Sequence, residues 1–137
     1  MAERKRIALL MGQADEFYQE RFVKGFLRQA FSQDMDVCIF SMYIKYQDTP
    51  AREIGDSNIY RLINYSRFDA VVILLDTIQT PGVAVALEEE IKERFSGPVL
   101  VVDLESRFFK TIWTDSYTPV RKLIDHLIED HGFTDIA

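Results

Sequence analysis

The stretch Asp69–Leu75, with the sequence DAVVILL, is the most continuous apolar run in this 137-residue chain. An apolar run without polar alternation is typical of a strand that is covered on both faces of a parallel sheet. We therefore expect this strand at the centre of the sheet. Strand-like and helix-like patterns alternate on both sides of it, which predicts an α/β fold with crossover helices.

Four further segments carry strand patterns. Arg6–Met11 is continuously apolar, and Asp36–Tyr43 is rich in Val, Ile, Phe and Tyr. Val99–Asp103 provides a fourth strand, and a short fifth strand is expected around Thr111–Thr114. We interpret Cys38, the only cysteine, as a small buried residue of the second strand.

Apolar residues recur at helical spacing between and after the strands, which predicts four helices packed on the sheet. Gly25 lies inside the first helix, and we expect it to permit close packing. The expected buried stripes are Phe22, Val23, Phe26, Leu27, Ala30 and Phe31; Ile59, Leu62 and Ile63; Leu87, Ile91 and Phe95; and Val120, Leu123, Ile124, Leu127 and Ile128. Together these elements predict a single domain, residues 1–137, built as a three-layer αβα sandwich with a parallel sheet.

Polar residues predict the ends of the helices and the loops. The polar segment Lys45–Arg52 contains Pro50 and is expected to form a mobile loop. Either Asp115 or Ser116 could cap the last helix. The acidic outer face of the third helix is expected to be solvated; it comprises Glu88, Glu89, Glu90 and Glu93.

The last helix has a recognisable end. His131 suits the negative end of the helix dipole, and Gly132 suits a left-handed cap. The remaining residues, Phe133–Ala137, have the pattern of another strand that begins there. His126 lies within the helix, and we interpret it as a surface residue.

Composition limits the classes of partner. The formal net charge is −6, from 22 acidic and 16 basic residues, and no basic stripe is present, so nucleic acid is not expected as a direct partner. The apolar stretch Ile7–Met11 is far too short for a signal sequence or a membrane span, so we expect a cytoplasmic chain. One cysteine provides neither a disulfide framework nor a thiolate zinc site, and no metal or cofactor is expected.

Ligands of open parallel α/β sheets bind beyond the carboxyl ends of the strands. The residues that follow the strands combine carboxylates, amides and aromatic rings, a mixture that suits a small polyol or sugar. Polar strand ends are also usual in any fold of this class, because the chain meets water there. The candidate ligand-binding residues are Gln13, Asp15, Phe17, Tyr18, Tyr43, Asp76, Thr77, Asp103, Glu105, Arg107 and Asp115.

No catalytic template fits the chain. Asp76 stands where receiver domains accept phosphate, but Gly12 and Gln13 follow the first strand instead of an acidic pair, and Asp103 follows the fourth strand instead of Ser or Thr. Neither a dinucleotide-binding nor a P-loop motif is present. We therefore expect no catalytic residue, and a degenerate receiver domain is the least favoured interpretation.

Several segments resemble the N-terminal lobe of the type I periplasmic binding protein-like domain of LacI/GalR regulators. The similar segments are RIALLM (Arg6–Met11), FYQERFVKGFLRQAF (Phe17–Phe31), IYRLINYSRFDAVVILL (Ile59–Leu75), GPVLVVD (Gly97–Asp103) and WTDSYTPVRKLIDHLIEDHGFTDIA (Trp113–Ala137). Ser116 replaces the usual Asn, Phe133 replaces the usual His, and Gln13–Glu16 replaces the usual N-P-F-F loop.

This resemblance implies a sensor that closes two lobes around a small, sugar-like molecule. It further implies a second lobe after Ala137 and a homodimer. Because only about six residues precede the first strand, too few for a DNA-binding module, an output domain is expected downstream. The resemblance implies a GGDEF diguanylate cyclase or a kinase there, and the Met1 start with the expected cytoplasmic character favours the diguanylate cyclase. An alternative from another class is a module that has lost its ligand and only dimerises in a signalling protein.

Overall fold

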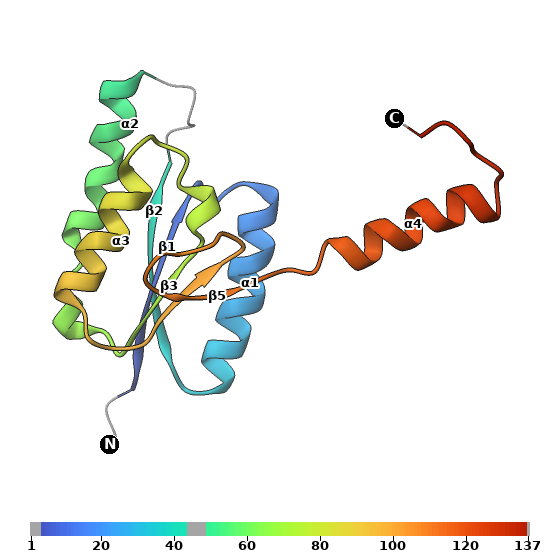
Figure 1. Ribbon diagram of the computed structural model, residues 1–137. Coiled ribbons are helices and arrows are strands. Elements are labelled where there is room, and N and C mark those ends of the chain that lie inside the picture. Colours follow the sequence, from blue (N-terminus) through green and yellow to red (C-terminus); the bar gives the residue numbers. More distant parts are fainter. Residues whose placement is uncertain (1–3, 44–48, 137) are drawn as a thin grey trace.

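The computed structural model describes residues 4–43 and 49–136. Within these residues, five strands form one all-parallel sheet in the spatial order β2-β1-β3-β4-β5 (Figure 1). The strands are β1 (Arg6–Gly12), β2 (Asp36–Met42), β3 (Ala70–Ile73), β4 (Val99–Val102) and β5 (Lys110–Ile112). The central position of β3 confirms the expectation for Asp69–Leu75, although Leu75 already begins a short 3₁₀ turn.

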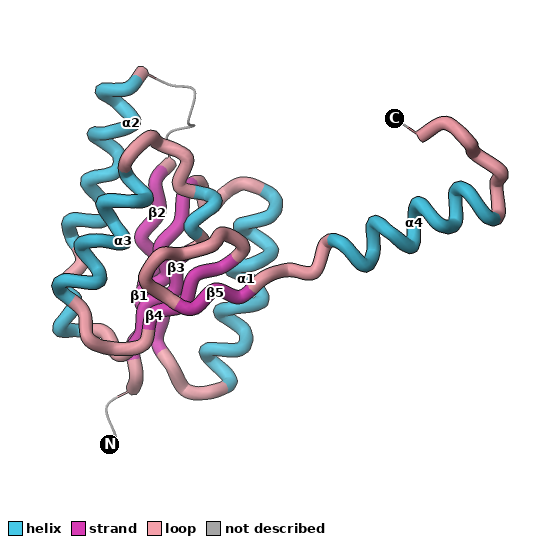
Figure 2. Tube along the Cα trace, viewed as in Figure 1, coloured by secondary structure: helices cyan, strands magenta, loops and turns pink. Residues whose placement is uncertain are grey.

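The helices complete the predicted three-layer αβα sandwich. Figure 1 shows α1 on one face of the sheet and α2 and α3 on the other, and Figure 2 shows the strands enclosed between these layers. The helices are α1 (Phe17–Ser32), α2 (Pro50–Ser57), α3 (Val83–Arg94) and α4 (Tyr117–Glu129), with 3₁₀ turns η1 (Asn58–Leu62), η2 (Tyr65–Arg67) and η3 (Leu75–Thr77).

Alternate side chains of the central strands enter two separate cores, as the pleat of a strand requires. On one face, Leu9 and Val72 pack with Phe22 of α1. On the other face, Leu10 and Ile91 belong to the core beneath η1 and α3. Burying each such side chain stabilises the fold by about 1.5–3 kcal/mol.

The strand order reverses direction between β1 and β3, and the ends of these strands are in close contact there. The N–H of Gly12 donates a hydrogen bond of 2.8 Å to Oγ1 of Thr77. A Cβ atom at Gly12 would lie 2.2 Å from the carbonyl oxygen of Thr77, a distance at which the backbone must shift. Only glycine allows this approach.

Several expectations about burial and packing were wrong. Cys38 is exposed, because β2 is an edge strand, and the neighbouring Ile39 is exposed as well. Glu88 is buried at 6% exposure, where its Oε1 accepts a 2.5 Å hydrogen bond from Ser106. Gly25 has nothing within 4 Å of its Cβ position, so close packing does not explain it. Two members of the predicted apolar stripes, Phe31 and Leu62, are also exposed.

The largest difference from the sequence prediction concerns α4. Figure 1 shows this helix projecting away from the sandwich, and none of its residues is buried. Its apolar stripe, expected to be buried, is therefore partly or fully exposed: Val120, Leu123, Ile124, Leu127 and Ile128. The described residues after α4 form no strand either, contrary to the expectation for Phe133–Ala137.

The predicted ends of α4 are nevertheless present. Oδ1 of Asp115 accepts a 3.1 Å hydrogen bond from the N–H of Thr118, while Ser116 at the N-cap position makes no side-chain cap. Gly132 has a φ of 68°, the left-handed conformation predicted for it. Of the expected mobile loop Lys45–Arg52, residues 45–48 lie outside the described part, and Pro50–Arg52 belong to α2.

The contact at Gly12 predicts that Gly12→Ala lowers the free energy of unfolding by about 2–4 kcal/mol, because the new methyl group collides with backbone. The matched control is Gly25→Ala, which should raise it by about 0.5–1 kcal/mol, since alanine favours the helix and meets no neighbour. Urea denaturation measures both variants, and equal effects would contradict the close approach.

The bare face of α4 predicts that Leu123→Ala changes the free energy of unfolding by less than about 0.5 kcal/mol. Ile91→Ala, at a fully buried position of α3, should cost about 2–5 kcal/mol. A large loss for Leu123→Ala in urea denaturation would mean that α4 packs on the sandwich in solution.

Candidate functional site

A cavity of about 200 Å³ opens at the carboxyl ends of β3 and β4, beside the first turn of α1. This is the edge of the sheet where ligands of open α/β folds bind. The cavity is lined by Tyr18, Leu74, Asp76, Thr77, Val102 and Asp103. Four of these six residues, namely Tyr18, Asp76, Thr77 and Asp103, are candidates from the sequence, so the fold brings together side chains that lie up to 85 positions apart.

The cavity stands on a rigid base at the end of β1. Thr77 both accepts a hydrogen bond from the N–H of Gly12 and donates one of 2.6 Å to the carbonyl of Leu74. The hydroxyl of Tyr60 donates to the carbonyl of Met11 at 2.7 Å, and Gln13 donates its N–H to the carbonyl of Met42 at 2.6 Å. These bonds fix the chain where β1 passes into α1.

Asp103 is held in one orientation. Its backbone has a φ of 60°, an uncommon conformation for a residue with a side chain, and its N–H donates to the carbonyl of Ile112 at 2.9 Å. Oδ1 accepts a 2.8 Å hydrogen bond from the N–H of Thr114, and Oδ2 accepts one from the hydroxyl of Tyr18. A residue that keeps a strained backbone at a cavity is a candidate for function.

The hydrogen bond between Tyr18 and Asp103 shifts the pKa values of the two side chains in opposite directions. Partial burial favours the neutral form of Asp103, but hydrogen bonds from Thr114 and Tyr18 outweigh it and lower the pKa of the carboxyl below its ordinary value. Burial, followed by the hydrogen bond and the charge of Asp103, raises the pKa of Tyr18 to about 12. Near neutral pH, Asp103 is therefore an anion and Tyr18 a neutral donor.

The lining determines which ligands the cavity suits. Leu74 and Val102 are almost fully buried and provide an apolar floor. Asp76 and Asp103 supply carboxylate oxygens, and none of the six lining residues is basic. Carboxylates accept hydrogen bonds from hydroxyl or ammonium groups and repel phosphate. The arrangement suits a neutral polyhydroxylated molecule or a cation.

The remaining candidates from the sequence do not line this cavity. Phe17 is exposed and lies under the guanidinium of Arg21, 5.4 Å from the ring centroid. Tyr43 is exposed, and its N–H donates to Oδ2 of Asp56 at 2.6 Å. Gln13 is half-buried beside the cavity base, while Asp15, Glu105, Arg107 and Asp115 are exposed.

Sequence reasoning missed three contributors. Leu74 and Val102 form the floor, and they could have been found because both lie at the end of a predicted strand, Val102 directly before Asp103 and Leu74 two residues before Asp76. Thr114 orients Asp103 through its backbone N–H. No side-chain pattern signals a backbone donor, so this contact depends on the fold.

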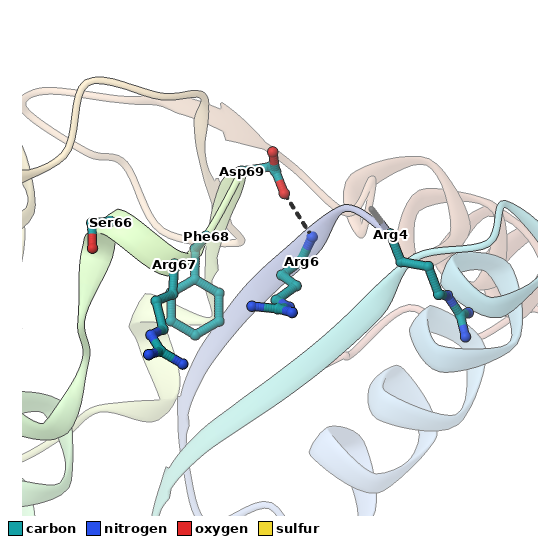
Figure 3. A pocket seen from close by; sticks show the side chains of 6 residues that line it. All are labelled: Arg4, Arg6, Ser66, Arg67, Phe68 and Asp69. Atoms are coloured by element: carbon teal, nitrogen blue, oxygen red, sulfur yellow. Dashed lines mark hydrogen bonds between the residues drawn. The ribbon is translucent and has the colours of Figure 1, made fainter. Parts of the chain in front are cut away.

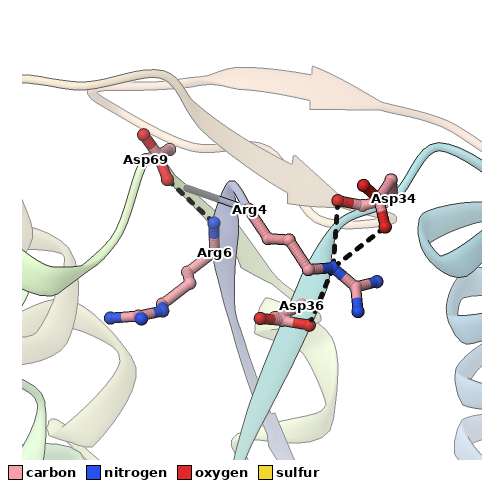
Figure 4. Close-up of polar contacts among 5 residues, drawn as sticks. All are labelled: Arg4, Arg6, Asp34, Asp36 and Asp69. Atoms are coloured by element: carbon pink, nitrogen blue, oxygen red, sulfur yellow. Dashed lines mark hydrogen bonds and ion pairs between the residues drawn. The ribbon is translucent and has the colours of Figure 1, made fainter. Parts of the chain in front are cut away.

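A larger cavity, of about 530 Å³, lies at the opposite, amino-terminal edge of the sheet (Figure 3). Part of its lining is tied into the fold, through the ion pairs of Arg4 and through the backbone N–H of Arg6. Oδ2 of Asp69 accepts the N–H of Arg6 at 2.8 Å, and Nε of Arg4 lies 3.1 Å from Oδ1 of Asp34 and 3.4 Å from Oδ1 of Asp36 (Figure 4). These contacts fasten the beginning of β1 to its neighbours, and we assign this region to structure.

The part of the chain that the structure describes contains neither a cluster of three or more metal-ligating side chains nor a membrane-spanning helix. Its residues contain no group of three or more His, Cys, Asp or Glu side chains placed to hold one metal ion. None of its helices has the length and apolar character needed to cross a membrane.

Comparison with known proteins identifies no family. No protein-family model matches the chain, and no curated protein matches it. The function is therefore inferred from the geometry of the cavity and the arrangement of the fold.

The bond between Tyr18 and Asp103 predicts that Tyr18→Phe raises the pKa of Asp103 toward its ordinary value, because one donor to the carboxylate is lost. A carboxyl with a lowered pKa stabilises the native state above its unfolded pKa, and this contribution is lost as pH falls through the folded pKa. The variant should therefore lose less stability on acidification.

A ¹³C NMR titration of the aspartate carboxyls measures this shift directly. Tyr43→Phe is the matched control, since Tyr43 is exposed and its backbone N–H donates to Asp56, not to Asp103. An Asp103 pKa that is the same in Tyr18→Phe and in the unsubstituted chain would refute the interaction.

Proposed function

We propose that this chain is the N-terminal sensing lobe of a LacI/GalR-like, two-lobed domain that binds a small, sugar-like molecule. The cavity lined by Tyr18, Asp76, Thr77 and Asp103 carries this proposal. Its carboxylates and hydroxyls pair with ligand hydroxyls, and its apolar floor accommodates the less polar face of a sugar ring. Its position beyond the carboxyl ends of β3 and β4 is the expected one for such a fold.

The proposed mechanism is lobe closure. Ligand bound between two lobes favours the closed state, and the equilibrium shifts only by the difference in affinity between closed and open states. In this chain, Asp103 and Tyr18 would contact the ligand directly, while Gly12 and Thr77 keep the cavity base rigid. The output domain we favour is a diguanylate cyclase that follows the second lobe.

The exposed apolar face of α4 supports the idea that another protein surface packs against this helix. An isolated 13-residue helix is only marginally stable in water, so a helix of this kind is normally stabilised by packing. In the two-lobed proposal, the covering surface belongs to the second lobe. The same face also favours the second candidate function, a module that binds no ligand and dimerises through α4.

The two functions can be separated by NMR on the ¹⁵N-labelled chain. Monosaccharides, polyols, nucleosides and a phosphorylated sugar are added at about 10 mM, because half of a cleft should bind with affinity no better than about 1 mM. A sensing lobe should show shifts of the amides of Tyr18, Thr77 and Asp103 with a neutral polyol, and weaker shifts with the phosphorylated analogue.

The matched variants are Asp103→Asn, which changes a lining residue, and Asp125→Asn, which changes an exposed residue of α4. Ligand shifts should disappear in the first and persist in the second. Absence of shifts with every compound, together with a dimer in sedimentation experiments that Leu123→Lys dissociates, would favour the dimerisation module instead.

A further inference from the structure

The end of α4 brings two imidazole rings together. His126 lies in the last turn of the helix and His131 lies just beyond it. Their Nε2 atoms are 3.1 Å apart, and the ring planes are nearly perpendicular, at 89°. Both side chains are exposed, so solvent and solutes reach the two nitrogens.

The helix cap produces this juxtaposition. Gly132, in the left-handed conformation, donates its N–H to the carbonyl of Ile128 at 3.1 Å, and Phe133 donates to the carbonyl of Leu127 at 3.1 Å. The first of these bonds is the αL motif of a helix C-terminus, and together the two bonds turn the chain back over the last helical turn. Because His131 precedes Gly132 directly, the turn holds its ring against His126.

A carboxylate orients one of the rings. Nδ1 of His126 lies 2.5 Å from Oδ2 of Asp130, and a carboxylate at that position accepts the Nδ1–H. In the neutral ring, this leaves the lone pair on Nε2, which faces His131. Metal-binding histidines usually donate the N–H of their second ring nitrogen to a carboxylate in this manner. The hydrogen bond fixes the tautomer and increases the basicity of the nitrogen that binds the metal.

We propose that His126 and His131 form a binding site for a divalent first-row transition metal, with Asp130 as its positioning residue. Two nitrogens on one tetrahedral metal, each at about 2.0–2.1 Å, lie about 3.3–3.4 Å apart. The rings need to separate by only a few tenths of an ångström from the observed 3.1 Å. Imidazole nitrogens select Cu²⁺, Ni²⁺ and Zn²⁺ over Mg²⁺ and Ca²⁺.

The site has two protein ligands. Asp130 lies at the far nitrogen of His126 and acts on the metal only through that ring. Since the described residues bring no third ligating side chain to this point, water fills the other coordination positions. Metal bound here joins the last turn of α4 to the segment that follows it, so it stabilises a helix that no other element covers. This inference is independent of the proposed ligand cavity.

The test titrates the full 137-residue chain with each metal chloride at up to about 0.1 mM, followed by calorimetry and by NMR of the histidine ring protons. We expect one metal per chain, with affinity highest for Cu²⁺, lower for Ni²⁺ and Zn²⁺, and no binding of Mg²⁺ or Ca²⁺. Zn²⁺ should also increase the amide exchange protection of α4.

Four variants test the assignment. His126→Asn and His131→Asn should each weaken Ni²⁺ and Zn²⁺ binding to the level of a single histidine. Asp130→Asn should weaken it about 10–100-fold while helix content, measured by circular dichroism, is unchanged. Asp125→Asn, on the same helix and in an ion pair with Arg121, is the matched control and should bind as the unsubstituted chain does.

Absence of Cu²⁺, Ni²⁺ and Zn²⁺ binding in this range would overturn the proposal. Binding that survives both histidine substitutions would also overturn it, since it would locate the metal elsewhere. Equal affinity of the Asp130→Asn and unsubstituted chains would refute the positioning role of Asp130.

Discussion

The backbone contact between Gly12 and Thr77 is the constraint on which the rest of the structure depends. It lies where the strand order reverses, between β1 and β3, and it joins two segments 65 residues apart. No other residue type fits at position 12 without displacing the carbonyl of Thr77. This contact sets the separation of the two strand ends, and thereby the position of Thr77 beside Tyr18, Asp76 and Asp103.

Charge is distributed differently at the two edges of the sheet. At the amino-terminal edge, Arg4 forms ion pairs with Asp34 and Asp36, and the backbone N–H of Arg6 donates to Asp69, which fastens the strands. At the carboxyl edge, Asp76 and Asp103 face a cavity whose lining has no basic partner. Hydrogen bonds keep Asp103 ionised, so the smaller cavity presents carboxylate acceptors, whereas the lining of the larger cavity contains three arginines and one aspartate. The smaller cavity is thus the better candidate for a neutral polyhydroxylated ligand, although the other is larger.

The sequence predicted the parallel αβα architecture and the central strand because those depend on long apolar runs and on strand–helix alternation. It also predicted four cavity residues, since parallel strands end at one edge. It failed where the outcome depends on what lies next to an element. Cys38 has the pattern of a buried strand residue but sits on the edge strand, and Glu88 has that of a surface residue but meets Ser106. The stripe on α4 is a real amphipathic pattern, but a pattern does not state which surface covers it.

The connection between Asp103 and α4 gives the molecule a mechanical property. Thr114, whose N–H binds the Asp103 carboxylate, is followed after two residues by the first turn of α4. A helix of 13 residues is about 20 Å long. Rotation of its base by about 10° would therefore move its far end by roughly 3.5 Å. A change in the direction of this short connection at the cavity would therefore be amplified along the length of α4.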